Sequence, residues 1–107
     1  MILIALDCDG TLDIGSPIGP IPVSRLYELN TSQYIHVVLV SASPFCVQLP
    51  FPRFISENTR LENLLAATVY YPSMLNIYIS DNPGDDENAR MAGFIYVHPK
   101  DFNFPIK

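Results

Sequence analysis

Basic residues and cysteines are scarce in this sequence. Its 107 residues hold six Lys and Arg against eleven Asp and Glu, which gives a formal net charge of −5. The chain therefore lacks the basic footprint that is typical of nucleic-acid-binding domains. Two cysteines, Cys8 and Cys46, are too few for a disulfide scaffold. The first residues, Met1 to Leu6, do not resemble a secretory signal, so we expect a reducing, cytoplasmic location.

Long apolar runs are also missing. A transmembrane helix needs about 20 consecutive apolar residues, and no stretch of this chain approaches that length, so we expect no membrane partner. Apolar residues nevertheless make up 49% of the chain and charged residues only 16%, a balance that excludes a disordered tail. The length suits one folding unit, and we predict a single domain over residues 1–107.

Short apolar runs alternate with segments that have helical features. The runs lack clean polar alternation, as is typical of strands buried on both faces. They are Ile2–Leu6, His36–Val40, Phe54–Ile55, Asn76–Ile79 and Phe94–Val97. The expected helices are Pro22–Asn30, Asn58–Ala67 and Asp85–Ala92, with a turn or two in Pro44–Leu49. This alternation predicts an α/β fold with a five-stranded parallel sheet.

Polar residues follow the apolar runs, among them Asp7, Ser41 and Asp81. Because the carboxyl ends of parallel strands lie at one edge of a sheet, we expect these three residues to lie close together. Asp7 at a strand end is suited to act as a nucleophile. Asp9 can turn into the same pocket because Gly10 tolerates a positive φ angle. Two neighbouring acids tend to divide the roles of nucleophile and proton donor, a pattern that fits phosphoryl transfer through an aspartyl-phosphate.

The segment Asp7-Cys8-Asp9-Gly10-Thr11 resembles the first motif of the haloacid dehalogenase (HAD) superfamily, in its phosphatase branch. Val37–Ser41 resembles the second motif, an apolar strand that ends in Ser or Thr. Ile79–Asp81, followed by Asp85 and a segment ending in Ala92-Gly93, is similar to the fourth motif in its spacing.

The third motif departs from the family pattern, which usually has a Lys between the third and fourth strands. The lysines of this chain, Lys100 and Lys107, both follow the fourth motif. Arg60 would have to serve instead, and Arg53 is less well placed. An Arg could bind phosphate oxygens bidentately.

The resemblance implies a three-layer, Rossmann-like fold with strand order 3-2-1-4-5. It also implies that no cap domain is present, because Asp13–Ile21 allows only a small flap and Ser43–Ile55 little more. Capless relatives often act on large substrates or use a neighbouring subunit as a lid. A homo-oligomer is therefore one arrangement that the resemblance suggests.

The resemblance also implies the roles of individual residues. Asp7 would attack phosphorus, and Asp9 would act first as the acid and then as the base. Ser41 and Arg60 would bind the phosphate oxygens together with backbone N–H groups at Gly10 and Thr11.

A magnesium ion is the cofactor that the resemblance implies. It would be held by Asp7, the backbone carbonyl of Asp9, and Asp81, which together make an all-oxygen site. Asp85 would bind it directly or through water. The expected protein is a magnesium-dependent phosphomonoester hydrolase whose phosphorylated substrate is a small molecule or a macromolecule.

Plainer interpretations stay open. Asp7 and Asp9 could be turn residues, Ser41 could simply begin a loop, and Arg60 could be a solvated helix residue. The protein could then be a catalytically weak relative that binds a phosphorylated ligand or a protein partner. A signalling receiver domain would need Asp and Lys where this chain has Ser56 and His98. The acidic charge argues against bare nucleic acid, although a metal and Arg60 could attract its terminal phosphate.

Overall fold

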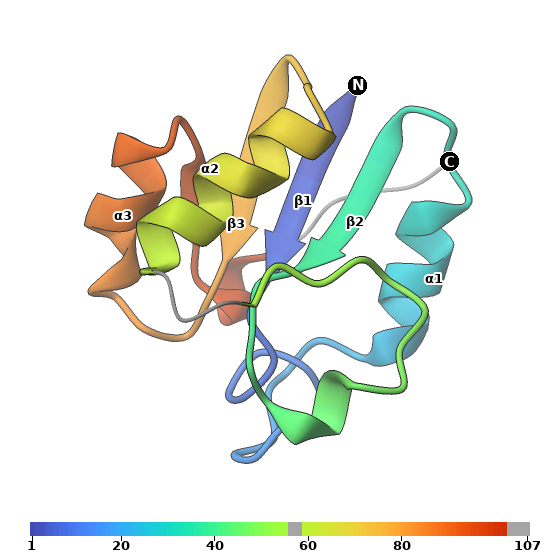
Figure 1. Cartoon of the computed structure of the whole chain (residues 1–107). Coiled ribbons are helices and arrows are strands. Elements are labelled where there is room, and N and C mark those ends of the chain that lie inside the picture. The colour runs from blue at the N-terminus through green and yellow to red at the C-terminus, as the bar shows by residue number, and fades with distance from the viewer. Residues whose placement is uncertain (56–58, 103–107) are drawn as a thin grey trace.

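A parallel sheet forms the centre of the molecule in the computed structural model, which describes residues 1–55 and 59–102. The sheet has four strands over these residues, in the order β2-β1-β3-β4 (Figure 1). They are β1 (Ile2–Leu6), β2 (Ile35–Leu39), β3 (Leu75–Ile79) and β4 (Ile95–Val97). The predicted α/β class and the parallel pairing are therefore confirmed.

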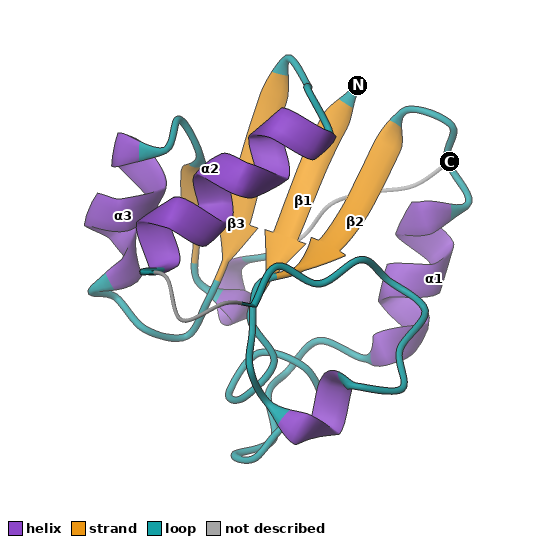
Figure 2. Ribbon diagram, in the orientation of Figure 1, coloured by secondary structure: helices purple, strands orange, loops and turns teal. Residues whose placement is uncertain are grey.

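Over the described residues, three α-helices and a short 3₁₀ helix connect the strands, and a second 3₁₀ helix follows β4 (Figure 2). They are α1 (Val23–Asn30), η1 (Pro44–Cys46), α2 (Arg60–Tyr70), α3 (Asp85–Met91) and η2 (Pro99–Asp101). Helix α2 begins after Thr59, whose hydroxyl accepts the N–H of Glu62 and caps the helix. Asn58, the first residue of the predicted helix Asn58–Ala67, lies outside the described residues. No helix in the described ranges is long and apolar enough to cross a membrane.

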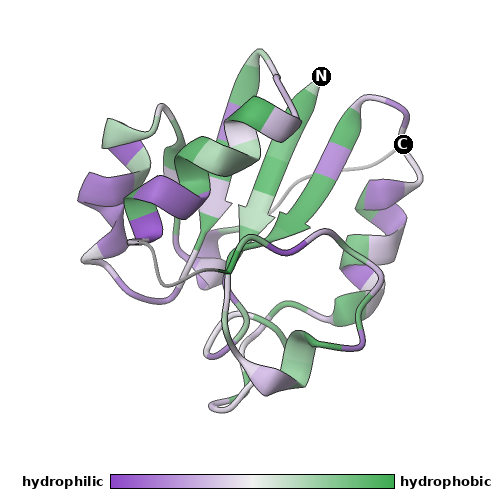
Figure 3. Cartoon of the chain, in the orientation of Figure 1, coloured by the Kyte–Doolittle hydropathy of each residue, from purple (hydrophilic) through white to green (hydrophobic). Residues whose placement is uncertain are grey.

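The helices cover both faces of the sheet, so the molecule has three layers. Helix α1 packs Leu26 and Leu29 against the face that carries Ile4 and Leu6. Helix α2 packs Leu64 against the opposite face, where α3 also lies. Strand β1 therefore alternates its side chains between two cores. Figure 3 shows the resulting pattern: the strands are largely hydrophobic and α3 is largely hydrophilic.

The predicted strand Phe54–Ile55 does not form in the described part of the chain. Its neighbour Arg53 makes only an isolated parallel bridge to Leu39, at the edge of β2. Two hydrogen bonds hold this bridge: Leu39 N–H donates to the Pro52 carbonyl at 2.8 Å, and Phe54 N–H donates to the Leu39 carbonyl at 2.8 Å. Proline lacks an N–H group, so the preceding Pro50 and Pro52 prevent a longer ladder. The expectation of five strands is therefore not confirmed.

Candidate functional site

The strand register brings the sequence-predicted residues to one edge of the sheet. Leu6 pairs with Leu39 on one side and with Ile79 on the other, so the three strands end at the same level. Asp7 follows directly after Leu6, and Asp81 lies two residues after Ile79. The loops that follow β1 and β2 lie together beyond the strand tips (Figure 1). This edge is where an open parallel sheet usually binds its ligands.

Asp7 is mostly buried, and its carboxylate Oδ1 accepts the N–H of Cys8 at 2.8 Å. Burial raises the pKa of Asp7 above its ordinary value of 3.8, and the nearby negative charge of Asp81 raises it further. The Cys8 N–H, the positive charge of Arg60 and a hydrogen bond with Ser41 oppose this rise. Asp7 thus interacts with side chains from three other segments of the chain.

Asp81 lies against the turn that follows Asp7. Gly10 has a φ of +75°, and a Cβ atom added there would lie 1.9 Å from Oδ2 of Asp81. Glycine is therefore needed at this position both for its backbone angle and for the space that the carboxylate fills. The predicted approach of Asp81 to Asp7 and its turn is thus visible in the packing.

The carboxylate of Asp9 is held by two donors at one oxygen. The hydroxyl of Ser43 donates to Oδ1 at 2.9 Å, and the N–H of Ser16 donates to the same atom at 3.0 Å. Neither serine was among the residues that the sequence singled out. Ser43 follows Ser41 at a spacing of two, and this spacing is the signal that could have identified it.

Ser41 is buried and connects the two acidic residues. Its Oγ accepts the N–H of Ser43 at 3.1 Å, and its side chain also interacts with Asp7. The segment from Ser41 to Ser43 therefore contacts Asp7 through its first residue and Asp9 through its third.

Arg60 is the first residue of α2, and its guanidinium group is directed toward the carboxyl edge. It donates to the carbonyl of Val40, and its Cζ lies 6.0 Å from the centroid of the Tyr78 ring. Its charge also lowers the pKa of Asp7. Because a guanidinium group has five N–H donors, the bond to Val40 leaves others for an anion.

The backbone N–H groups predicted to bind phosphate are already paired. The Gly10 N–H donates to the Pro17 carbonyl at 2.7 Å, and the Thr11 N–H donates to the Cys8 carbonyl at 3.1 Å. The Thr11 hydroxyl is buried without a hydrogen-bond partner within the described residues. The N–H groups of Asp9 and Ala42 have no partner in the same ranges, so they remain free to donate to an anion.

Asp85 has a different environment from the one expected of a metal ligand. It is 6% exposed, and its Oδ2 accepts the hydroxyl of Ser80 at 2.8 Å and that of Tyr78 at 3.3 Å. These bonds tie the start of α3 to the end of β3. Asp85 therefore serves as an internal anchor in this structure.

Without Asp85, the oxygen atoms expected to bind a metal still suit a small, hard cation. The carboxylates of Asp7 and Asp81 interact, and the carbonyl of Asp9 accepts no hydrogen bond from the described residues. Two carboxylates and a carbonyl are oxygen ligands of the kind that Mg²⁺ prefers. No group of three or more His, Cys, Asp or Glu side chains that could hold a metal occurs in residues 1–55 and 59–102. A magnesium site here would therefore depend on the backbone carbonyl and on water.

Comparison of the chain with protein-family models, with curated proteins and with solved structures finds no match. The site is thus interpreted from its own geometry.

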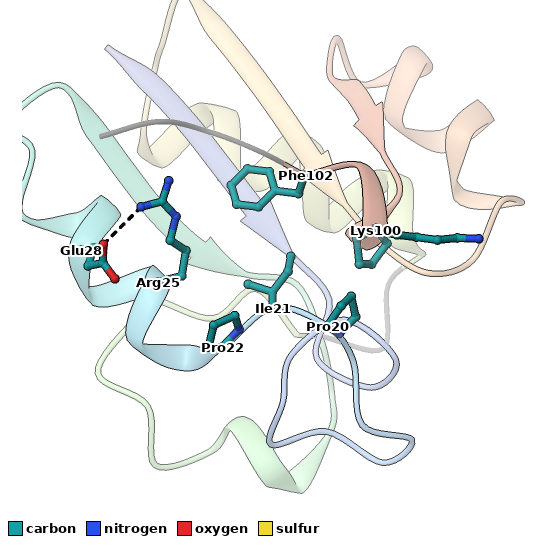
Figure 4. Close-up of a pocket in the computed structure, with 8 residues that line it drawn as sticks. Pro20, Ile21, Pro22, Arg25, Glu28, Lys100 and Phe102 are labelled. Carbon is teal, nitrogen blue, oxygen red and sulfur yellow. Dashed lines mark hydrogen bonds and ion pairs between the residues drawn. The ribbon is translucent and has the colours of Figure 1, made fainter. Parts of the chain in front are cut away.

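A pocket of about 400 Å³ lies away from these carboxylates, between the start of α1 and η2. Its walls include Ile21, Arg25 and Phe102 (Figure 4). Arg25 is paired there with Glu28 at 3.2 Å, and the side chain of Lys100 extends away from the other labelled residues. None of the predicted site residues lines this pocket.

Proposed function

We propose that this chain is a minimal, capless member of the HAD superfamily that hydrolyses phosphomonoesters with Mg²⁺. The observation that carries the proposal is the convergence on Asp7 of Ser41, Arg60 and Asp81, which come from three other segments. A turn residue with a purely structural role would need neither a half-buried arginine nearby nor a second carboxylate against its own turn.

The sheet supports the same assignment. The bridge of Arg53 to Leu39 lies on the side of β2 opposite β1, because Val40 N–H donates to the Leu6 carbonyl while the Leu39 N–H points the other way. This is the position expected for the third strand in the order 3-2-1-4-5. We infer that this segment represents the shortened third strand of the family.

Each residue then has a chemical role. Asp7 attacks phosphorus and forms an aspartyl-phosphate, while Asp9 protonates the leaving alcohol oxygen. Asp9 next removes a proton from the water that attacks the intermediate, which releases inorganic phosphate and restores Asp7. Ser41 and Arg60 bind the phosphate oxygens and stabilise the charge that develops on them.

The metal would be held by the carboxylates of Asp7 and Asp81 and the carbonyl of Asp9. When bound, Mg²⁺ supplies positive charge that offsets the repulsion between the phosphate and these carboxylates. We further infer a reducing, cytoplasmic setting, supported by the free thiols of Cys8 and Cys46.

Turnover of phosphomonoesters by the purified protein tests the proposal. We expect release of phosphate from p-nitrophenyl phosphate and from phosphorylated metabolites, peptides or oligonucleotides in the presence of Mg²⁺. Asp7→Asn should lower the rate by at least about a thousandfold, because it removes the nucleophile. Asp13→Asn is the matched control, since Asp13 is exposed in the same loop and its carboxylate accepts the N–H of Val23.

Removal of the metal with a chelator should abolish turnover, and added Mg²⁺ should restore it. Equal, negligible turnover by the wild type and Asp7→Asn would contradict the proposal. That outcome would favour the alternative in which the chain binds a phosphorylated ligand or a protein partner without hydrolysis.

A further inference from the structure

We propose that Ser43 is a positioning residue for Asp9 and fixes which carboxylate oxygen transfers the proton. This inference rests on the proposed phosphatase function, in which Asp9 is the acid and base. It adds a residue from the loop after β2 that the sequence motifs do not include.

The two hydrogen bonds to Asp9 are both at Oδ1. They come from the Ser43 hydroxyl at 2.9 Å and the Ser16 N–H at 3.0 Å. The other oxygen, Oδ2, accepts no hydrogen bond from the residues that the structure describes. A proton on Oδ1 would have to displace one of the donors, whereas Oδ2 is open. Proton transfer therefore takes place at Oδ2.

The hydroxyl of Ser43 is itself held in a fixed direction. Its Oγ accepts the N–H of Phe45 at 3.3 Å, which makes Ser43 the cap of η1. A serine hydroxyl carries a single proton, so accepting from Phe45 leaves that proton for Asp9. The Ser43 carbonyl also accepts the thiol of Cys46 at 3.2 Å. Because Ser43 is only 7% exposed, water does not readily replace these partners.

Ser43 also couples the acid to the phosphate-binding side of the site. Its N–H donates to Ser41 Oγ at 3.1 Å, and Ser41 interacts with Asp7. A single segment of three residues thereby sets the positions of both aspartates relative to each other. The reaction requires this fixed spacing, because the nucleophile Asp7 must lie in line with the phosphorus atom while the acid Asp9 reaches the leaving oxygen.

Two substrates with different leaving groups distinguish this role from a merely structural one. An alkyl phosphate has a poor leaving group that depends on protonation, whereas p-nitrophenolate leaves with little help from an acid. For Ser43→Ala, we expect kcat/KM to fall about tenfold or more with the alkyl phosphate, since a hydrogen bond to a charged group is lost. With p-nitrophenyl phosphate, we expect a fall of less than about twofold.

Two further variants separate the hydroxyl from the cap. Ser43→Thr keeps the hydroxyl and should restore most of the activity with the alkyl phosphate. Ser43→Gly loses the hydroxyl but keeps most of the capping stability, so it provides a folded test if Ser43→Ala does not fold. Ser73→Ala is the matched control: it removes a hydroxyl that donates to the Tyr71 carbonyl at 3.1 Å, before β3 at the opposite edge of the sheet.

Crystal structures of the wild type, Ser43→Gly and Ser43→Thr give a readout that does not depend on turnover. We expect the Asp9 carboxylate to rotate in Ser43→Gly and to keep its place in Ser43→Thr. An inactive wild-type protein would count against the phosphatase function, whereas the role of Ser43 is overturned by an unmoved Asp9 in Ser43→Gly. Equal losses with both substrates would overturn it as well.

Discussion

Gly10 lies directly against the carboxylate of Asp81, in the turn that follows Asp7. It has a φ of +75°, and its Cα borders the carboxylate of Asp81. Gly93 has a similar φ of +82°, but a Cβ atom there would have no neighbour within 4 Å. The two glycines therefore share a backbone requirement and differ in whether a carboxylate lies against them.

Gly10→Ala should displace the Asp81 carboxylate and raise the Mg²⁺ concentration for half-maximal activity by about tenfold or more. Gly93→Ala should leave this concentration unchanged. Both variants should lose about 1–2 kcal/mol of unfolding free energy, because alanine is strained at positive φ. Magnesium titrations of activity and urea unfolding measure the two effects. Equal magnesium dependence in the two variants would contradict the placement of Asp81 in the metal site.

The buried carboxylate of Asp7 lowers the free energy of unfolding by an amount that depends on pH. Its pKa is raised, mainly by burial, so folding disfavours the ionised form relative to the unfolded chain. At neutral pH the carboxylate is ionised and the cost is present. Below the folded-state pKa the group is protonated, and the cost disappears as the pH falls toward the ordinary value of 3.8.

Asp7→Asn should therefore melt at a higher temperature than the wild type at pH 7, while losing activity. The difference in melting temperature should shrink as the pH is lowered through the folded-state pKa. Thermal unfolding of both proteins across this range, without metal, tests the sign. A difference that grows on acidification would show that Arg60 and the hydrogen bonds outweigh burial.

Arg60 is the first residue of helix α2, so the position of its side chain depends on whether the first turn of the helix stays folded. Thr59 caps this turn by accepting the N–H of Glu62 at 3.3 Å. Thr59→Ala should lower the unfolding free energy by about 1 kcal/mol. It should also raise KM for the phosphate ester, because the first turn frays and Arg60 moves with it.

Thr68→Ala in the same helix serves as the control. Its hydroxyl donates to the Leu65 carbonyl at 2.6 Å, near the opposite end of the helix from Arg60. We expect a change of about 0.5 kcal/mol or less and an unchanged KM. Steady-state kinetics and urea unfolding measure both variants. A rise in KM in Thr68→Ala as large as in Thr59→Ala would rule out a specific effect on Arg60.

The elements were predicted unequally well, for physical reasons. β1 was predicted with its observed bounds, and β2, β3 and β4 within one residue at their ends, because buried parallel strands are marked by continuous apolar runs. The segment Phe54–Ile55 is apolar in the same way, yet the prolines before it limit the ladder to a bridge. The apolar composition of a segment indicates that it is buried, whereas its pairing with a neighbouring strand also requires backbone N–H donors at the right positions.

The two cores of the molecule share the strands β1, β2 and β3, whose side chains alternate between them. This sharing has a consequence for unfolding. Leu26 packs in one core and Leu64 in the other, and both are fully buried. Leu26→Ala and Leu64→Ala should each cost about 2–5 kcal/mol. Both should unfold in a single transition with the wild-type urea dependence, because neither layer has a sheet of its own.

Val69→Ala is the control for these substitutions. Val69 is 75% exposed on α2, so its truncation should change the unfolding free energy by about 0.5 kcal/mol or less. Urea unfolding followed by circular dichroism and by tyrosine fluorescence measures all three variants. Transitions that separate between the two probes would contradict a shared cooperative unit.

The order of residues along the chain was enough to predict the α/β class and the meeting of Asp7 with Ser41 and Asp81 at one edge of the sheet. These features follow from local apolar runs and from the rule that parallel strands end together. Only the tertiary structure shows three other features: the hydrogen-bond partners of Asp9, the anchoring role of Asp85, and the hydrogen bonds of the Gly10 and Thr11 N–H groups. Such contacts depend on how loops distant in sequence pack against one another, and side-chain hydrogen bonds over these separations leave no periodic trace in the sequence.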